Sequence, residues 1–329
     1  MRAFAYQKVQ VPGDAVMAVV GTPEAKFIAG GTTLVDLMRI GVETPGTVVD
    51  VNALPLKTIQ ALPGGGVRIG ALARMSEVAA HPLIVRDFPA VSQALLLSAS
   101  PQLRNKASIG GNLMQRTRCS YFRDTASACN KREPGSGCSA LQGENRMLAV
   151  LGTSESCIAT NAGDMAVAMV ALDALVRIRG PKGDRIVPLV DFHLLPGSTP
   201  QKETVLAPGE LILAVDLPGA AHARNSHYLK VRDRASYEFA VTSAAVGLSV
   251  AGGLIVSARV ALGGVGTKPW RSKEAEAALI GKAASRATFQ AAAQLALRGA
   301  KPRSQNAFKI PLAQRTLIRA LDIVSGGTL

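Results

Sequence analysis

Four cysteines, all that the 329-residue chain contains, lie within a stretch of 39 residues. They are Cys119, Cys129, Cys138 and Cys157, separated by nine, eight and eighteen residues. Metal ligation needs thiolates, and cationic neighbours lower thiol pKa values and offset the negative charge of a thiolate-bound cluster. The cations of this stretch are Arg116, Arg118, Arg123, Lys131, Arg132 and Arg146. The spacing fits neither zinc ribbons nor the compact ferredoxin run. The four nearby cysteines and the cations favour an iron–sulfur cluster, and zinc or merely buried or free thiols are left open.

A glycine pair offers a second kind of chemistry, the binding of phosphate groups. In FIAGGTTLVDLM an apolar strand end is followed by Gly30 and Gly31, by the hydroxyls of Thr32 and Thr33, and by a helix that starts at Leu34. Phosphate groups need backbone N–H donors at close range, and glycine lets the chain approach without a Cβ clash. A pyrophosphate site is therefore predicted here, with an ordinary strand–turn–helix connection as the alternative.

Two further segments are candidates for binding a ligand. LRNKASIGGNLMQ is expected to place Ser108, Gly110, Gly111 and Asn112 in a turn after a basic stretch. NAGDMAVAMVAL puts Asp164 just before an apolar helix, where capping the helix is its most frequent role. No G-x-G-x-x-G fingerprint or P-loop spacing occurs, and the four histidines do not cluster, so a nicotinamide or nucleoside triphosphate site is disfavoured.

The elements that must position these residues follow from the hydrophobic pattern. Apolar strands at 48–51 and 67–72 alternate with helical stretches such as 88–98, which is an α/β pattern. A strand over 210–218 ends at a Pro-Gly pair, where we predict a domain boundary. Beyond it, two apolar runs separated by residues 251–253 predict a hairpin, and helices follow. The last helix is expected to place Lys309, Arg315 and Arg319 on a solvated or subunit-facing surface.

Composition restricts the class of protein. Hydrophobic residues make up 48% and charged residues 18% of the chain, and no apolar run approaches the ~20 residues that span a bilayer. The net charge is +14, and residues 281–329 carry eight basic side chains but only one acid, Asp322. Such a charge favours phosphate-bearing ligands or an acidic partner subunit. Aromatic residues amount to only 4%, so nucleic-acid binding is disfavoured.

Taken together, the motifs resemble the FAD-binding medium subunit of the molybdenum hydroxylases, the xanthine dehydrogenase and aldehyde oxidoreductase family. The resemblance covers nearly the whole chain and rests on AGGTTLVDLM, RNKASIGGN, NAGDMA, ELILAVDLP, YLKVRDRASYEFAVTSAAVGL and LGGVGTKPWR, in this order. The cysteine segments are similar to a subgroup resembling the periplasmic aldehyde oxidoreductase, whose flavin subunit carries an extra 4Fe-4S cluster in an inserted loop. These segments are QRTRCSYFRD, ACNKREPGSGC and LGTSESCIATNAGDM.

The resemblance implies an α+β fold. Residues 1–220 would form an FAD-binding domain of the PCMH or vanillyl-alcohol-oxidase-like type, made of two α/β subdomains with a cysteine-containing loop inserted at 115–158. Residues 221–329 would form a smaller α+β domain of the CO-dehydrogenase flavoprotein C-terminal type.

The resemblance also implies an oxidoreductase of several subunits. A large partner would hold the molybdenum cofactor and oxidise the substrate, and a small partner would carry 2Fe-2S clusters. This chain would pass their electrons through FAD to an external acceptor, with no substrate-oxidising residue of its own, no nucleic-acid partner and no membrane insertion. Its N-terminal segment shows no export signal, so a cytoplasmic location is expected, or a periplasmic one by co-export with a signal-bearing partner subunit.

Carried over to this sequence, the family's contacts predict particular site residues. The FAD pyrophosphate would contact Phe27, Ile28, Ala29, Gly30, Gly31, Thr32, Thr33 and Leu34. Ser108, Gly111 and Asn112 would contact the phosphate or ribitol region, and Asp164 the ribityl or adenosine hydroxyls. Ile212 and Lys230 would flank the isoalloxazine ring. The cluster ligands would be Cys119, Cys129, Cys138 and Cys157.

Two other functions remain possible from the sequence. One is a stand-alone flavin oxidoreductase resembling the peptidoglycan-precursor reductase, with its own nicotinamide site. The other is a basic interaction protein with buried thiols and no cofactor. Taken without the resemblance, Lys230, Arg232 and Arg234 alternate along a strand and are typical of a solvated face.

Overall fold

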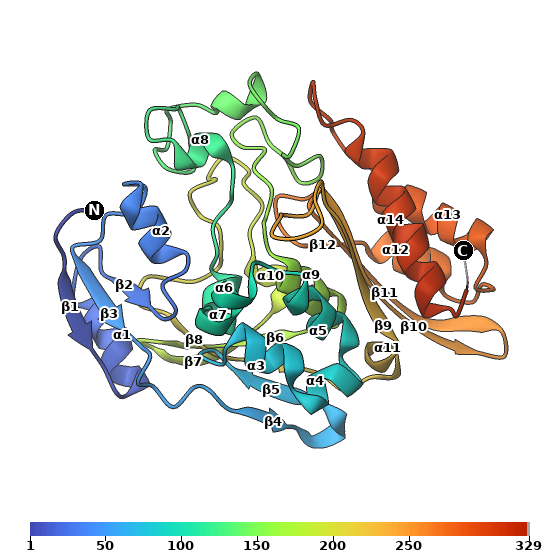
Figure 1. Cartoon of the computed structure of the whole chain (residues 1–329), viewed down its shortest axis with the longest axis horizontal. Helices are drawn as coiled ribbons and strands as arrows, with labels where there is room; N and C mark the ends of the chain where they lie inside the picture. The colour runs from blue at the N-terminus through green and yellow to red at the C-terminus, as the bar shows by residue number, and fades with distance from the viewer. Residues whose placement is uncertain (328–329) are drawn as a thin grey trace.

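The computed structural model describes residues 1–327 and contains three β-sheets (Figure 1). The first is a parallel sheet of three short strands in the order β1-β3-β2. Its strands are β1 (Ala5–Lys8), β2 (Lys26–Ile28) and β3 (Thr47–Asp50), connected through α1 (Pro12–Val20) and α2 (Leu34–Arg39). The strand predicted at 48–51 is therefore confirmed. The glycine-rich segment connects β2 to α2.

The second sheet is antiparallel and has the order β4-β5-β8-β6-β7. Its strands are β4 (Ile59–Ala61), β5 (Val67–Gly70), β6 (Leu175–Gly180), β7 (Gly183–Pro188) and β8 (Leu211–Leu217), with a 3-10 turn, η1 (Pro63–Gly65). Helices follow β5: α3 (Met75–Ala80), α4 (Pro82–Asp87), α5 (Pro89–Leu96), α6 (Pro101–Lys106) and α7 (Ile109–Leu113). The short α10 (Leu189–Phe192) follows β7.

Helix α9 (Asp164–Ala171) lies at the centre of the main hydrophobic core. Every one of its residues is buried, which explains why its sequence is apolar on all sides. The same core includes residues of β5, β6 and β8 and reaches Tyr228 and Ala245, which lie beyond residue 220. The two halves of the chain therefore share one continuous apolar interior.

The C-terminal part contains an antiparallel sheet in the order β12-β11-β10-β9, flanked by helices. Its elements are α11 (Ala221–Arg224), β9 (Ser226–Val231), β10 (Thr242–Ala251), β11 (Leu254–Gly263), β12 (Trp270–Arg271), α12 (Lys273–Leu279), α13 (Arg286–Ala296) and α14 (Lys309–Val324). The predicted hairpin is confirmed as β10–β11, and its turn places Gly252 and Gly253 at φ 58° and 77°. Helix α14 packs on β10 and β9 (Figure 1).

One prediction for α14 is wrong. Arg315 and Arg319 are exposed, but Lys309 is fully buried. Its ammonium group donates hydrogen bonds to the carbonyl oxygens of Met147 (3.0 Å) and Leu148 (3.1 Å), which belong to the cysteine-containing segment. These acceptors replace water and allow the first helical residue to point inward.

The cysteine-containing segment has little regular structure and lies at the top of Figure 1. It contains α8 (Ser120–Arg123), the 3-10 turn η2 (Ser139–Leu141) and a single β-bridge between Cys129 and Cys138. Phe122 and Ile158 are fully buried in a small core of this segment, together with Leu37 of α2. The segment therefore has an apolar centre of its own, and it packs on the helix that follows the glycine pair.

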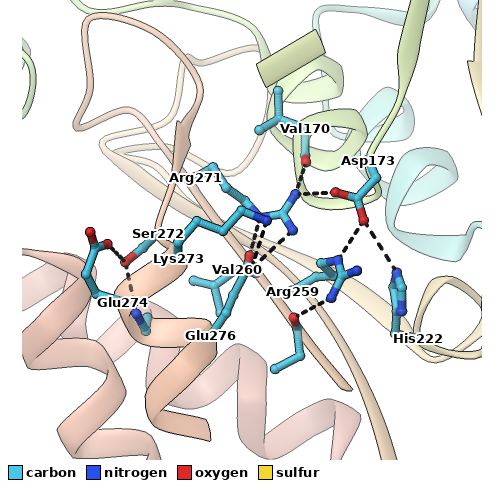
Figure 2. A network of polar contacts seen from close by, with 12 residues as sticks. Val170, Asp173, His222, Arg259, Val260, Arg271, Ser272, Lys273, Glu274 and Glu276 are labelled. Carbon is cyan, nitrogen blue, oxygen red and sulfur yellow. Dashed lines mark hydrogen bonds and ion pairs between the residues drawn. The ribbon is translucent and has the colours of Figure 1, made fainter. Parts of the chain in front are cut away.

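A polar network fastens the end of α9 to the C-terminal sheet (Figure 2). Asp173 adopts φ 57°, rare for a residue other than glycine, and binds Arg259 Nε at 2.7 Å and Arg271 Nη1 at 3.0 Å. Arg271 also pairs with Glu276 and donates to the carbonyl oxygen of Val170 at 2.6 Å. Burial disfavours the Asp173 carboxylate, but the two guanidinium groups outweigh burial and lower its pKa. The strained backbone at Asp173 thus orients its carboxylate toward Arg259 and Arg271, two arginines of the C-terminal sheet.

Within residues 1–327, no helix combines the length and the apolar character needed to cross a membrane.

Candidate functional site

A cavity of about 1220 Å³ opens between the parallel sheet, α7 and the long connection from α10 to β8. It exceeds the ~300–1,000 Å³ typical of pockets for drug-sized ligands, so a dinucleotide has room in it. Eleven of the fourteen residues predicted to bind FAD line it: Phe27, Ile28, Ala29, Gly30, Gly31, Thr32, Thr33, Leu34, Ser108, Gly111 and Ile212. The whole β2–α2 connection therefore lies on the cavity wall.

The glycine pair is required by the local geometry. A Cβ on Gly30 would collide with the carbonyl oxygen of Lys106. Gly31 has φ 75°, a conformation that side chains disfavour, and its Cβ would lie 3.2 Å from Val35 Cγ2. Within residues 1–327, the backbone N–H groups of Gly31, Thr32 and Thr33 donate no hydrogen bond. Unpaired amides in a close-fitting glycine loop fit the phosphate groups of a dinucleotide.

The second glycine cluster forms a short helix, not the predicted turn. Ser108 is the residue before α7, and its Oγ accepts a hydrogen bond from the N–H of Gly111 at 3.3 Å. Gly110 packs against Ala71, whose Cβ would lie 3.0 Å from a Cβ at this position. Asn112 points away from the cavity lining: its Nδ2 donates to Met75 Sδ at 3.4 Å, and its buried Oδ1 has no partner within the described residues. The serine cap and the close packing of Gly110 explain the helix.

Asp164 and Lys230 also lie outside the cavity lining. Asp164 is the first residue of α9 and does not cap it; Gly163 precedes the helix instead. The Asp164 carboxylate accepts hydrogen bonds from Lys230 Nζ (2.8 Å), Tyr228 Oη (2.6 Å) and Ser98 Oγ (3.0 Å). The Lys230 side chain is 1% exposed, so the solvated face considered for it is wrong, because a buried carboxylate replaces water around its ammonium group.

Sequence reasoning missed an ionic group on the cavity wall. Arg116 binds Glu43 at 2.6 Å and Glu203 at 2.5 Å, and Lys131 Nζ binds Glu203 at 2.9 Å. Burial opposes the charge on Glu203, but Lys131 and Arg116 outweigh it and lower its pKa. In the sequence the two cations, Arg116 and Lys131, stand out only as neighbours of the cysteines. Their carboxylate partners lie 73 and 87 residues from Arg116, and no local pattern connects them.

A second missed residue of the cavity wall is His193. Its Nε2 lies 3.0 Å from the carbonyl oxygen of Leu113, and its ring packs edge-on against Phe192. Burial lowers the pKa of His193 to about 4, so the ring is neutral at physiological pH. This wall position therefore contributes a neutral aromatic surface.

The four cysteines converge on one small second cavity. All four are free thiols. Burial raises the pKa of Cys119, and it raises that of Cys157 to about 11 although the charge of Lys131 opposes it. The N–H of Ala159 donates to Cys157 Sγ at 3.4 Å. The donor set is thus four sulfur atoms with at least one backbone donor, the chemistry that iron–sulfur clusters use.

Among residues 1–327, no three His, Cys, Asp or Glu side chains are arranged to hold a single metal ion. The thiolates of a 4Fe-4S cluster each bind a different iron and so lie farther apart than the ligands of one ion.

The two cavities are adjacent. Lys131, Cys157 and Ala159 line both of them. On the other side, Arg118 and Arg123 of the cysteine-containing segment bind Asp36 of α2 at 3.2 and 2.7 Å. The cysteine-containing segment therefore contacts the surroundings of the large cavity at two places, the shared lining residues and helix α2.

Comparison with known proteins identifies the family. Residues 2–220 match the model of the FAD binding domain in molybdopterin dehydrogenase, and residues 227–324 match that of the CO dehydrogenase flavoprotein C-terminal domain. The aldehyde oxidoreductase FAD-binding subunit PaoB of Escherichia coli K12 is 50% identical over 322 residues, covering 98% of each chain. The carbon monoxide dehydrogenase medium chain of Hydrogenophaga pseudoflava is 26% identical and covers 97% of this chain and 96% of its own.

Solved structures agree in fold. A carbon monoxide dehydrogenase from Hydrogenophaga pseudoflava has a TM-score of 0.77 at 25% identity, covering 99% of this chain and 98% of its own. Quinoline 2-oxidoreductase from Pseudomonas putida 86 has a TM-score of 0.76 at 24% identity, covering 100% and 99%. The predicted fold class is therefore confirmed. With family models matching nearly its whole length, this chain belongs to the FAD-binding medium subunits of the molybdenum hydroxylases, components of oxidoreductases.

Proposed function

We propose that this chain binds FAD in the 1220 Å³ cavity and passes electrons from 2Fe-2S clusters of a partner subunit to an external acceptor. The observation that carries the proposal is the β2–α2 connection, where two required glycines and three unpaired amides line a cavity of dinucleotide size. FAD, when bound, supplies the exchange of electrons. The chain would supply the position of FAD and a neutral wall at His193.

The proposed contacts divide the cavity into regions. Residues 27–34 line the cavity and would hold the pyrophosphate, and Ser108 and Gly111 would contact the phosphate or ribitol region. Ile212, also on the wall, would flank the isoalloxazine ring. The proposal also includes Asn112, Asp164 and Lys230, which do not line the cavity and would reach FAD only through side-chain movement. The unpartnered Oδ1 of Asn112 favours such a movement, because a buried acceptor without a donor is costly.

We also propose that Cys119, Cys129, Cys138 and Cys157 together ligate one 4Fe-4S cluster. Their convergence on one cavity, their free thiols and the surrounding basic side chains support it. Burial raises the pKa of two of these thiols, Cys119 and Cys157, so they would be thiolates only when bound to a metal centre.

The proposed assembly has three kinds of subunit. A large subunit holds the molybdenum cofactor, a small subunit holds the 2Fe-2S clusters, and this chain, divided near residue 220, holds FAD. We propose an aldehyde as the substrate class, because a relative at 50% identity is an aldehyde oxidoreductase subunit. The location, cytoplasmic or periplasmic, then follows the partner subunits.

Anaerobic reduction of the flavin tests this function. The complex, co-expressed with its partner subunits, is mixed with an aldehyde, and the flavin absorbance near ~450 nm is followed. The proposal predicts bleaching by the aldehyde only when the partners are present. Bleaching of the isolated chain by a reduced nicotinamide cofactor, NADH or NADPH, would instead support the stand-alone reductase. A colourless chain, isolated with its partners, would support the interaction protein.

A further inference from the structure

Lys131 stands between the two cavities. It is the single cation among the three residues that line both. Its side chain is 11% exposed, and its ammonium group lies 2.9 Å from Glu203 Oε1 and 2.9 Å from the carbonyl oxygen of Pro200. Both acceptors belong to the connection between α10 and β8, which also lines the large cavity. The charge is therefore held at a fixed place and has little freedom to turn into solvent.

The ionic group around Lys131 is not neutral. Its members are the cations Lys26, Arg116 and Lys131 and the carboxylates Glu43 and Glu203. Three cations against two carboxylates leave a formal charge of +1 at this wall. Lys131 lines the cysteine cavity together with all four cysteines, so its charge lies at the wall of that cavity. In a partly buried site the interaction between this charge and a charge in the cavity is screened less than at the surface.

We propose that Lys131 tunes the redox centre held by the four cysteines, its ammonium group raising that centre's reduction potential. The inference rests on the proposed 4Fe-4S site. Each electron that the centre accepts adds one negative charge to a set of four thiolates. A fixed ammonium group at the cavity wall stabilises the reduced form more than the oxidised form. Lys131 does not ligate iron; it acts through its charge, and Glu203 moderates that charge.

Redox titration of the assembled complex tests this role. The reduced cluster is followed by electron paramagnetic resonance, and iron and FAD are counted in every sample. Lys131→Met is expected to lower the equilibrium constant for reduction at least tenfold, a fall of about 59 mV for one electron. Lys131→Arg keeps the charge and should keep the potential. Lys182→Met removes a lysine that is exposed and lines neither cavity, and it should also leave the potential unchanged.

A second variant, for which the expected shift in potential is upward, keeps the inference testable if Lys131→Met loses its cluster. Glu203→Gln removes the carboxylate that moderates Lys131, so it should raise the potential. A fully loaded Lys131→Met complex with an unshifted potential overturns the inference. If that variant loads no iron, an unchanged or lowered potential in Glu203→Gln overturns it. A wild-type chain without such iron overturns the proposed cluster and this inference together, so the two failures are distinguishable.

Discussion

Lys230 Nζ lies 2.8 Å from Asp164 Oδ2, in a place where the two side chains are only 1% and 6% exposed. The pair joins β9 of the C-terminal sheet to the first residue of the central helix α9. Lys230 also donates to the carbonyl oxygen of Leu97 at 3.1 Å, and Tyr228 donates to the other carboxylate oxygen. An ion pair so deeply buried persists only because each charge is satisfied by the other and by these neighbours.

Removing one partner of this pair should be more harmful than removing both. Lys230→Met leaves an uncompensated carboxylate, and we expect it to lower the free energy of unfolding by about 3–5 kcal/mol. The double variant Lys230→Met with Asp164→Asn should recover part of that loss, because the amide oxygen can still accept from Tyr228 and the amide N–H can donate to Ser98 Oγ. Urea unfolding of the three proteins checks this. Equal losses in the single and double variants would show that the pair is not the cause.

The pyrophosphate loop is tested by Gly31→Val. The φ of 75° at Gly31 is disfavoured for a branched residue by about 1–3 kcal/mol, and its Cβ would press on Val35. We expect FAD content to collapse. Gly46→Val is the matched control, since Gly46 is exposed, has no positive φ and has no atom near its Cβ position. Stoichiometric FAD in Gly31→Val would contradict the loop's assignment.

The buried ammonium group of Lys309 should make stability depend on pH. Burial and the nearby Arg146 lower its pKa to about 7, although Asp233 opposes them. Between this pH and the usual lysine value of 10.5 the unfolded chain binds the extra proton. The free energy of unfolding should therefore rise with pH across that window, by at most about 1.4 kcal/mol per pH unit.

Lys309→Met should remove this contribution. The carbonyl oxygens that Lys309 contacts keep other donors, Thr160 for Met147 and Asn306 for Leu148, so the variant should fold. Denaturant unfolding at several pH values between 7 and 10, with Lys182→Met as an exposed control, provides the comparison. If wild type and Lys309→Met gained stability equally with pH, Lys309 would not be the source.

Local patterns explain what could be predicted from the sequence. The β10–β11 turn needs positive φ at Gly252 and Gly253, and the loop at 27–34 needs glycine at Gly30 and Gly31. Such requirements act on a few adjacent residues and are visible in the sequence.

Distant contacts explain what could not be predicted. Asp164 has a local pattern typical of a helix cap. Its carboxylate instead accepts hydrogen bonds from Tyr228 and Lys230, which lie 64 and 66 residues later. Glu43 and Glu203 are likewise invisible as partners of Arg116, because the fold alone brings them to the same wall. The basic side chain of Lys309 predicts an exposed position. It is buried because carbonyl groups of a remote segment accept its hydrogen bonds.

A single cysteine substitution tests the ligand set. Cys157→Ser should lose the iron of the proposed cluster, because a tetrathiolate site lacks one ligand. We also expect loosening of residues 115–158, measured as faster amide exchange, since metal binding contributes to the folding of such segments. Phe122 and Ile158 should hold part of the segment's small core together. An unaltered iron count in Cys157→Ser would exclude Cys157 as a ligand.

The cofactor content of the wild-type chain, purified from its native source with its partner subunits, tests both proposed cofactor sites most directly. Flavin released by denaturation and iron determined by metal analysis are both expressed per chain. We expect one FAD and roughly four iron atoms per chain beyond those of the 2Fe-2S partner. A chain without flavin would contradict the assignment of the large cavity, and iron equal to that of the partner alone would contradict the four-cysteine site.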